Sequence, residues 1–152
     1  MSFRIERAGL DAVETIIEHR RAMFFDMGYR DTAALQAMSA AFGPWLDEKM
    51  RAGEYLAWLA LADGRIAAGL GLWLMDWPPH LIGTGSRRGN ILNVYTHPDY
   101  RRQGMARALV DTALAWCRGN GIGCVILHAS VEGRPLYESL GFQATNEMRL
   151  LR

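Results

Sequence analysis

The chain has 152 residues, of which 50% are hydrophobic and 22% are charged, and this is enough for one domain with a buried core. Seventeen basic residues against sixteen acidic residues give a net charge of +1, which argues against a general binder of nucleic acid or of membrane surfaces. No apolar run reaches the length of a membrane span, and the first residues lack a signal-peptide core. We therefore expect a single domain over residues 1–152, located in the cytoplasm.

The first third of the chain predicts a short strand followed by two helices. Apolar and polar residues alternate over residues 3–8, as in a half-buried strand. Apolar residues then recur at helical spacing up to Gly28, and again from Asp31 or Thr32 to about Gly53. Pro44 is expected to break or kink the second helix, because proline removes an intrahelical hydrogen bond. His19 is expected on the surface of the first helix.

Two strands with a tight turn between them are predicted next. Residues 55–62 and 65–75 are almost continuously apolar, which is typical of strands that are covered on both faces and lie centrally in a sheet. Asp63-Gly64 between them is a strong hairpin signal. Gly69-x-Gly71 lies inside the second of these strands and is not interpreted as a phosphate loop. Residues 76–89, which contain Pro78-Pro79, are predicted to form a loop.

Residues 90–116 predict a strand, a basic turn and a helix in that order. The strand stops at Pro98, and the helix begins near Gly104. The first turn of a helix has backbone N–H groups without partners and a positive dipole end, and both favour a phosphate. The small residues Gly104 and Ala106 leave room for a ligand, and arginines surround the turn: Arg101, Arg102 and Arg107. The turn is interpreted as a pyrophosphate site, and the alternative is an ordinary turn with solvated arginines.

The last third predicts a strand at residues 124–129, a short helix at residues 134–140 and one or two closing strands within residues 142–151. Cys117 and Cys124 do not have the spacing of metal ligands; we expect free thiols, and the alternative is a disulfide across the turn at residues 119–123. His128 and Cys124 share one face of a strand but lie about 13 Å apart, too far to bind one ion. No metal is predicted.

Two ordered segments resemble the GNAT acetyltransferase superfamily. Its acetyl-CoA motif is Arg or Gln, two residues, Gly, one residue, then Gly or Ala, and Arg101, Gly104 and Ala106 occupy those positions. Residues 130–142 are similar to the family's Asn-x-x-x-x-x-x-Tyr-x-x-x-Gly-Phe, with Tyr137 in the tyrosine position. The resemblance implies a GNAT-like α/β fold: a mixed, mostly antiparallel central sheet, helices on both faces, and a splay between strands 4 and 5.

The resemblance also implies that acetyl-CoA is the cofactor. Its binding residues would come from the fourth strand, the basic turn and the second motif: Val94, Tyr95, Thr96, Arg101, Arg102, Gln103, Gly104, Met105, Ala106, Arg107, Ser130 and Tyr137. Ser130 stands where the family usually has an asparagine, and its shorter side chain weakens the expected contact with the pantetheine arm.

The implied reaction is acetyl transfer to a primary amine of a small molecule or peptide, by direct attack in a ternary complex. Tyr137 is the expected general acid, since a free tyrosine titrates near ~10 and holds its proton at neutral pH. The base is open. Asn90 and Asn93 on the fourth strand could hold a relay water, and Asn93 is included among the catalytic residues; the other candidates are Asp76, His80, His97 and Glu132.

The acceptor side is expected from the first two helices and the loop after the third strand, with these candidates: Phe24, Tyr29, Trp73, Asp76 and Trp77. Asp76 beside Trp77 would suit a cationic acceptor, whereas Phe24 and Trp73 would equally suit the core. Two alternatives remain: a non-catalytic acyl-CoA sensor on the same fold, and a P-loop-like nucleotide binder, against which the lack of a Gly-Lys-Ser/Thr sequence counts. A homodimer is left open.

Overall fold

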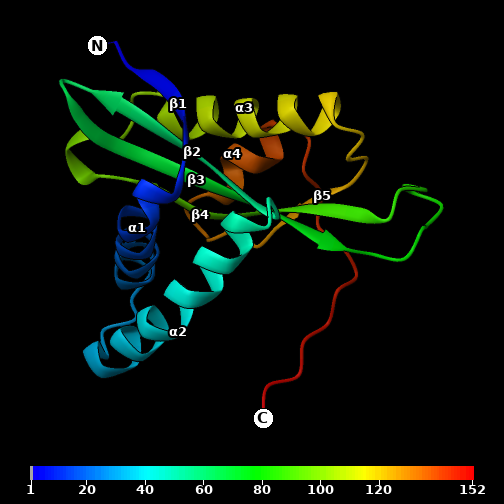
Figure 1. Cartoon of the computed structure of the whole chain (residues 1–152), viewed down its shortest axis with the longest axis horizontal. Coiled ribbons are helices and arrows are strands. Elements are labelled where there is room, and N and C mark those ends of the chain that lie inside the picture. The colour runs from blue at the N-terminus through cyan, green and yellow to red at the C-terminus, as the bar shows by residue number, and fades with distance from the viewer. Residues whose placement is uncertain (1) are drawn as a thin grey trace.

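The computed structural model describes residues 2–152 as a five-stranded sheet with helices on both faces (Figure 1). The elements in chain order are β1 (Arg4–Ala8), α1 (Val13–Asp26), α2 (Thr32–Arg51), β2 (Tyr55–Ala62), β3 (Arg65–Asp76), β4 (Arg87–Thr96), α3 (Met105–Gly119), β5 (Val125–Leu127) and α4 (Arg134–Ser139), with short 3-10 turns at Leu10–Ala12 and Pro98–Tyr100. No helix in the described part of the chain is long and apolar enough to span a bilayer.

The strands lie in the order β1-β2-β3-β4-β5, with β1 to β4 antiparallel to their neighbours and β5 parallel to β4. Only Gly89, Asn90 and Ile91 of β4 pair with β5. The strand continues to Thr96, so residues 92–96 have no strand partner on that side. The predicted splay between strands 4 and 5 is therefore confirmed, and it opens toward the start of α3.

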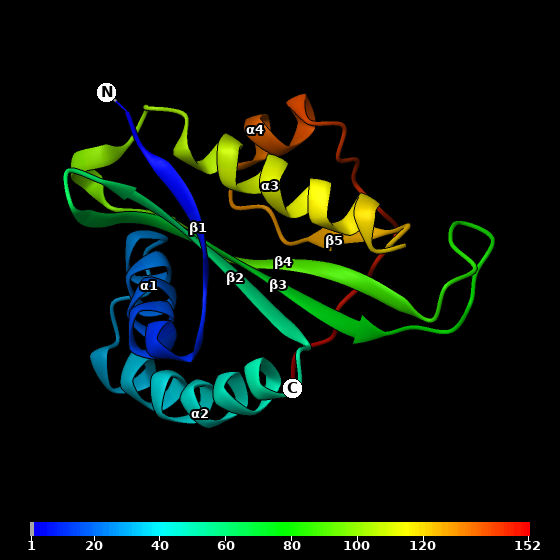
Figure 2. The same ribbon diagram turned by 45° about the horizontal axis from the view of Figure 1, so that its top comes forward.

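The sheet separates two layers of helices, as Figure 2 shows: α1 and α2 cover one face, and α3 and α4 cover the other. Alternate side chains of the strands supply the two cores. Leu56, Trp58 and Ala60 of β2 join the core under α3, whereas Tyr55, Ala57 and Leu59 join the core under α1 and α2. The apolar strands β2 and β3 thus lie inside the sheet and are covered on both faces, as their sequence predicted.

Two element boundaries differ from what the sequence suggested. Helix α2 does not break at Pro44, because the proline removes one donor while Phe42 and Leu46 on either side remain buried and hold the helix against the sheet. The predicted loop over residues 76–89 is shorter, because Asp76 and Arg87 still pair across the β3–β4 hairpin. The Asp63-Gly64 turn connects β2 and β3 as predicted.

The end of the chain also differs from its prediction. Strand β5 has three half-buried residues where residues 124–129 were expected to form a buried strand. Residues 142–151 form no strand in the described structure; the segment runs away from the sheet (Figure 1) and leaves its apolar residues Met148, Leu150 and Leu151 exposed. Alternating residues make a strand only where a neighbouring strand accepts their hydrogen bonds, and this segment has no such neighbour.

Candidate functional site

The basic turn after β4 adopts the conformation of an anion site. Arg102 and Gly104 both have a left-handed backbone, with φ of 63° and 83°. Such alternation turns successive backbone N–H groups toward one point, where an anion can accept from several of them. Glycine suits position 104 because of its φ, and a Cβ atom there would meet nothing within 4 Å, so the side of the turn that a ligand would approach is open.

The backbone donors of this turn are unused. Within residues 2–152, no oxygen accepts a hydrogen bond from the N–H groups of residues 102–107, and the first bond at the start of α3 runs from the N–H of Ala108 to the oxygen of Gly104, at 3.1 Å. No side chain caps α3, and its first turn has no acidic residue. Unpaired donors at the positive end of a 15-residue helix fit a diphosphate group.

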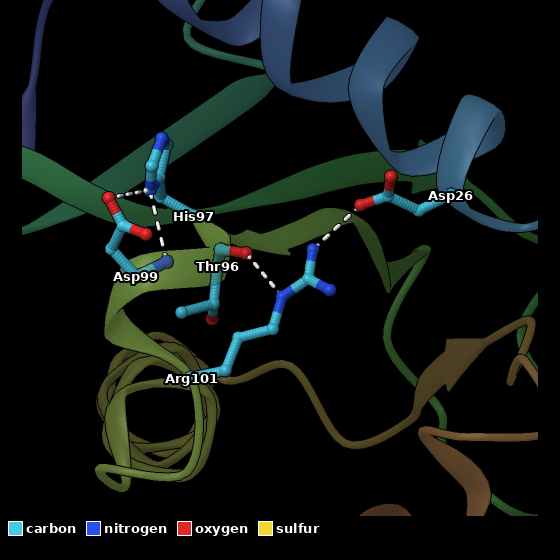
Figure 3. Close-up of polar contacts among 5 residues, drawn as sticks. All are labelled: Asp26, Thr96, His97, Asp99 and Arg101. Atoms are coloured by element: carbon cyan, nitrogen blue, oxygen red, sulfur yellow. Dashed lines mark hydrogen bonds and ion pairs between the residues drawn. The ribbon is translucent and has the colours of Figure 1, made fainter.

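The arginines around the turn do not all face this point. Arg101 donates from Nε to the Thr96 carbonyl at 2.9 Å and from Nη2 to the Asp26 carboxylate at 2.6 Å, as Figure 3 shows. Arg107 donates to the Ser139 hydroxyl at 2.6 Å and so connects α3 to α4. Arg102 makes no hydrogen bond or ion pair within residues 2–152, and it is the arginine that remains available to an anion.

Strand β4 contains a bulge where the splay begins. Gly69 pairs with Tyr95 and Gly71 pairs with Leu92, so Leu70 of β3 opposes both Asn93 and Val94. Bulges bend a strand and re-aim its groups, and they are frequent beside functional sites. Past the bulge, Val94, Tyr95 and Thr96 have no strand partner on the β5 side, although the Thr96 carbonyl already accepts from Nε of Arg101.

Asn93 at the bulge is the centre of a buried polar network. Asn93 has a left-handed backbone conformation, with φ of 57°, and the residue is 5% exposed. Its Oδ1 accepts from Nη1 of Arg20 at 2.7 Å, and its Nδ2 donates to the Tyr55 hydroxyl at 2.8 Å. Burial raises the pKa of Tyr55 to about 12, so this hydroxyl is neutral. A Cβ at Gly71 would lie 1.8 Å from that hydroxyl, which explains the glycine in the strand.

Sequence reasoning missed Arg20 and Tyr55 and misplaced His19. The His19 ring lies 5.1 Å from the Tyr95 ring, measured between centroids, because this side of α1 packs on β4. Burial lowers the pKa of His19 to about 4, so the imidazole is neutral at pH 7. The available signal was the Gly69-x-Gly71 pair, which removes side chains from the face of β3 that these larger residues cover.

The second motif forms the turn into α4. Tyr137 is 9% exposed and packs edge-on against Phe142, with 6.0 Å between ring centroids. Burial raises the pKa of Tyr137, so its hydroxyl keeps its proton at neutral pH. The Ser130 hydroxyl accepts a hydrogen bond from the Gly133 N–H at 3.0 Å and shapes this turn. Serine is shorter than the family's asparagine, and this hydrogen bond further reduces its ability to contact a pantetheine arm.

The structure separates the predicted acceptor residues into two groups. Phe24 and Tyr29 contact each other at 5.7 Å between ring centroids, near the open end of β4. Asp76 pairs with Arg87, which precedes Val94 by seven residues, or about 23 Å of strand. Trp77 follows Asp76 in the chain, and the Arg88 guanidinium lies over its ring. Trp73 packs against Trp45 in the core. These residues form a group separate from Phe24 and Tyr29: Trp73, Asp76 and Trp77.

The candidate bases are also dispersed. His80 belongs to the hairpin loop beyond Asp76, and Glu132 is exposed before α4. His97 accepts the Asp99 N–H at Nδ1, at 3.2 Å, and ends β4 (Figure 3). The buried Oδ1 of Asn90 has no partner within residues 2–152. In the same part of the chain no three His, Cys, Asp or Glu side chains gather as a metal site, and Cys117 and Cys124 are unbonded.

Solved structures resemble this chain over nearly its whole length. The chain is 36% identical to a GCN5-related N-acetyltransferase from Ralstonia eutropha JMP134, with 99% of each chain covered and a TM-score of 0.94. It is 25% identical to a predicted acetyltransferase from Clostridium acetobutylicum that was solved with acetyl-CoA, with 99% of this chain and 96% of that chain covered and a TM-score of 0.87.

Residues 14–142 match the model of the acetyltransferase (GNAT) family. Among curated proteins, the chain is 35% identical over 88 residues to the glucosamine 6-phosphate N-acetyltransferase of Trypanosoma brucei brucei, covering 57% of this chain and 58% of the relative. It is 29% identical over 93 residues to human N-acetyltransferase 8, covering 59% of this chain and 39% of the relative. The matched part is thus less than two thirds of each of these relatives.

Proposed function

The chain belongs to the GNAT acetyltransferase family, and from this premise we propose that it transfers an acetyl group from acetyl-CoA to a primary amine of a small molecule or peptide, by direct attack in a ternary complex. GNAT acetyltransferases use acetyl-CoA. The observation that carries the proposal is the row of unused backbone N–H groups over residues 102–107, at a helix N-terminus beside the splay.

The residues present fit this cofactor. The N–H groups of residues 102–107 and the Arg102 guanidinium would hold the diphosphate, and the unpaired edge of β4 over residues 94–96 would hold the pantetheine arm. The cofactor supplies a thioester whose acetyl carbon is open to attack by an amine. A backbone N–H at Val94 would stabilise the negative charge that develops during attack, an effect of roughly 3–4 kcal/mol for one such donor in other enzymes.

Tyr137 is the general acid in this proposal. A thiol resembling cysteine titrates near ~8.5 and a tyrosine near ~10, so proton transfer to the leaving thiolate is uphill by about 2 kcal/mol, a small barrier. Burial raises the pKa of Tyr137, which increases the cost of this transfer above that of a free tyrosine while it keeps the hydroxyl protonated at neutral pH. The incoming amine would lose its proton to solvent before it attacks, since residues 92–96 contain no carboxylate and the side chain of Asn93 already bonds to Arg20 and Tyr55.

A non-catalytic acyl-CoA sensor is the second candidate. Two observations favour it: residues 92–96 contain no carboxylate that could act as a base, and Ser130 is occupied by the Gly133 N–H. The sensor would bind acetyl-CoA without turnover. One of the relatives is named for glucosamine 6-phosphate, which makes amino sugars a reasonable first class of acceptor to assay.

The proposal is tested by measuring free thiol released from acetyl-CoA with a panel of amines, using the protein and its Tyr137→Phe variant. We expect turnover in the parent and about 100-fold lower kcat in the variant, with unchanged acetyl-CoA affinity, because only proton donation is lost. Tyr100→Phe is the matched control, since Tyr100 is also a buried tyrosine, at 5% exposed. Equal kcat in both variants would remove the acid role, and binding without any turnover would favour the sensor.

A further inference from the structure

Arg20 on α1 is a half-buried cation without an acidic partner. Other arginines of the chain form ion pairs, for example Arg51 with Asp47 and Arg134 with Glu138, but no carboxylate pairs with Arg20 within residues 2–152. Burial lowers the pKa of this guanidinium, which nevertheless stays charged at neutral pH. Removing a charge from water without a counter-charge is unfavourable, so a buried cation of this kind is expected where a ligand supplies the anion.

The surroundings hold this guanidinium in one orientation. Its Cζ lies 5.1 Å from the centre of the Phe24 ring and 4.7 Å from the centre of the Phe42 ring, so aromatic side chains of α1 and α2 pack against it. Nη1 donates to Asn93, and the buried Nε has no partner within residues 2–152. Nη2 makes no hydrogen bond or ion pair within residues 2–152, so this oriented guanidinium can donate from Nη2 to a carboxylate or phosphate.

Arg20 lies close to the place where the acceptor amine would meet the acetyl group. Asn93, its hydrogen-bond partner, lies in the β4 bulge directly before Val94, where the splay begins and where the acetyl group is expected. The nearby carboxylates of α1 are already paired, Glu18 with Arg21 and Asp26 with Arg101. Asp76, which would have suited a cationic acceptor, is about 23 Å away along β4. The charge that an acceptor meets beside the bulge is therefore positive.

We infer that Arg20 binds an anionic group of the acceptor, so that the preferred substrates are short amines with a carboxylate or phosphate a few bonds from the nitrogen. This inference rests on the proposed acetyltransferase function and specifies its substrate class. Arg20 is a specificity-determining residue in this account: it selects and orients the acceptor, and the acetyl transfer itself takes place at the backbone of β4.

Matched pairs of amines test the inference. Butylamine and 4-aminobutyrate differ by a carboxylate, and ethanolamine and phosphoethanolamine differ by a phosphate, so the two pairs also distinguish the two anions. For each amine, kcat/KM is measured by thiol release, and binding to the CoA-saturated protein is measured by calorimetry. The variants are Arg20→Gln, which removes the charge, and Arg20→Lys, which keeps it without the planar fork. Arg30→Gln is the control, because Arg30 also lies over a ring, that of Phe25, but is exposed.

In the parent we expect at least one anionic amine to have a kcat/KM about 10- to 100-fold above that of its neutral partner, as for other buried charge pairs. Arg20→Gln should abolish this ratio because the loss in kcat/KM is larger for the anionic amine than for the neutral one, Arg20→Lys should retain part of the ratio, and Arg30→Gln should retain all of it. Equal values within both pairs in the parent, or an unchanged ratio in Arg20→Gln, would overturn the inference, as would equal losses for charged and neutral amines.

The binding measurement separates this inference from the proposed function. If no amine is acetylated, the acetyltransferase proposal fails, and the inference is then decided by calorimetry alone. Tighter binding of 4-aminobutyrate or phosphoethanolamine than of its neutral partner, lost in Arg20→Gln, would uphold the anion site. Absence of that difference would refute it. The melting temperature of each variant and its affinity for CoA show whether the fold and the cofactor site are intact, and Arg20→Lys decides the question if Arg20→Gln does not fold.

Discussion

The N-termini of α2 and α3 are built in opposite ways. At the start of α2, the Asp31 carboxylate accepts a hydrogen bond from the Ala34 N–H at 3.1 Å and closes the first turn. At the start of α3, Gly104 has no side chain to do this, and the first turn contains no acidic residue. Both ends have the same kind of donors and the same positive dipole, but the protein caps the start of α2 itself and leaves the donors at the start of α3 unpaired.

Several features beside the missing cap distinguish the start of α3 from that of α2. A helix N-terminus alone is common, and a single carboxylate is enough to occupy it. In α3 three further features coincide: left-handed residues Arg102 and Gly104 turn the preceding N–H groups inward, Arg102 adds a free charge, and β4 has an unpaired edge next to the turn. At α2 the first turn is not open, because the Asp31 side chain already caps it.

The largest effect is expected from adding a carboxylate to the open end. Ala106 and Ala33 are the second residues of α3 and α2, respectively. Ala106→Glu should weaken CoA binding by about 100-fold, because the new carboxylate competes for the N–H groups and repels the diphosphate; each hydrogen bond to a charged group contributes about 1.5–3 kcal/mol. Ala33→Glu is the matched control and should leave CoA affinity unchanged. Calorimetric titration of CoA measures both, and similar affinities for the two variants would contradict the assignment of the α3 site.

A smaller effect is expected from opening the closed end. Asp31→Ala removes the cap of α2, which should lower the free energy of unfolding by about 1 kcal/mol and the melting temperature by about 2–4 °C. CoA affinity should not change, since α2 lies on the other face of the sheet from α3 (Figure 2). Thermal denaturation with and without CoA provides the measurement. A loss of CoA affinity here would show that the two helix ends are coupled through the sheet.

The same contrast explains which parts of the site were predictable from sequence. The proposed anion site consists of consecutive backbone groups, so a local pattern from Arg101 to Ala106 was enough to predict the turn whose N–H groups are unpaired. The Arg20–Asn93–Tyr55 network joins residues 73 and 38 positions apart in sequence, and no local pattern announces such a contact. The closing strands predicted within residues 142–151 did not form, because strand formation depends on a neighbour that the local sequence does not specify.

Parts of the fold that depend on local sequence were also easier to predict than parts that depend on contacts between distant residues. The covered strands β2 and β3, the Asp63-Gly64 turn and the start of α3 follow from hydrophobic periodicity and turn chemistry within short windows, and all were placed correctly. Helix α2 does not break at Pro44 because packing of Phe42 and Leu46 against the sheet outweighs one missing hydrogen bond, and packing is a tertiary effect. The strand register places Asp76 and Trp77 at the far end of the β3–β4 hairpin from the splay, and register is not specified by a short sequence window.

The smallest expected effect concerns the charge beside the open end of α3. Asp26 pairs with Arg101 at 2.6 Å, and the two side chains are 40% and 44% exposed (Figure 3). In Asp26→Asn the Arg101 guanidinium is no longer neutralised, so the turn gains one positive charge and CoA should bind about 2- to 5-fold more tightly at low ionic strength. Near 1 M salt the gain should disappear, because exposed charges are screened over about 3 Å. Asp47→Asn removes a similar exposed pair, with Arg51 on α2, and should have no effect. Weaker CoA binding in Asp26→Asn at both salt concentrations would instead mean that Asp26 holds Arg101, and with it the turn, in the geometry that binds the diphosphate.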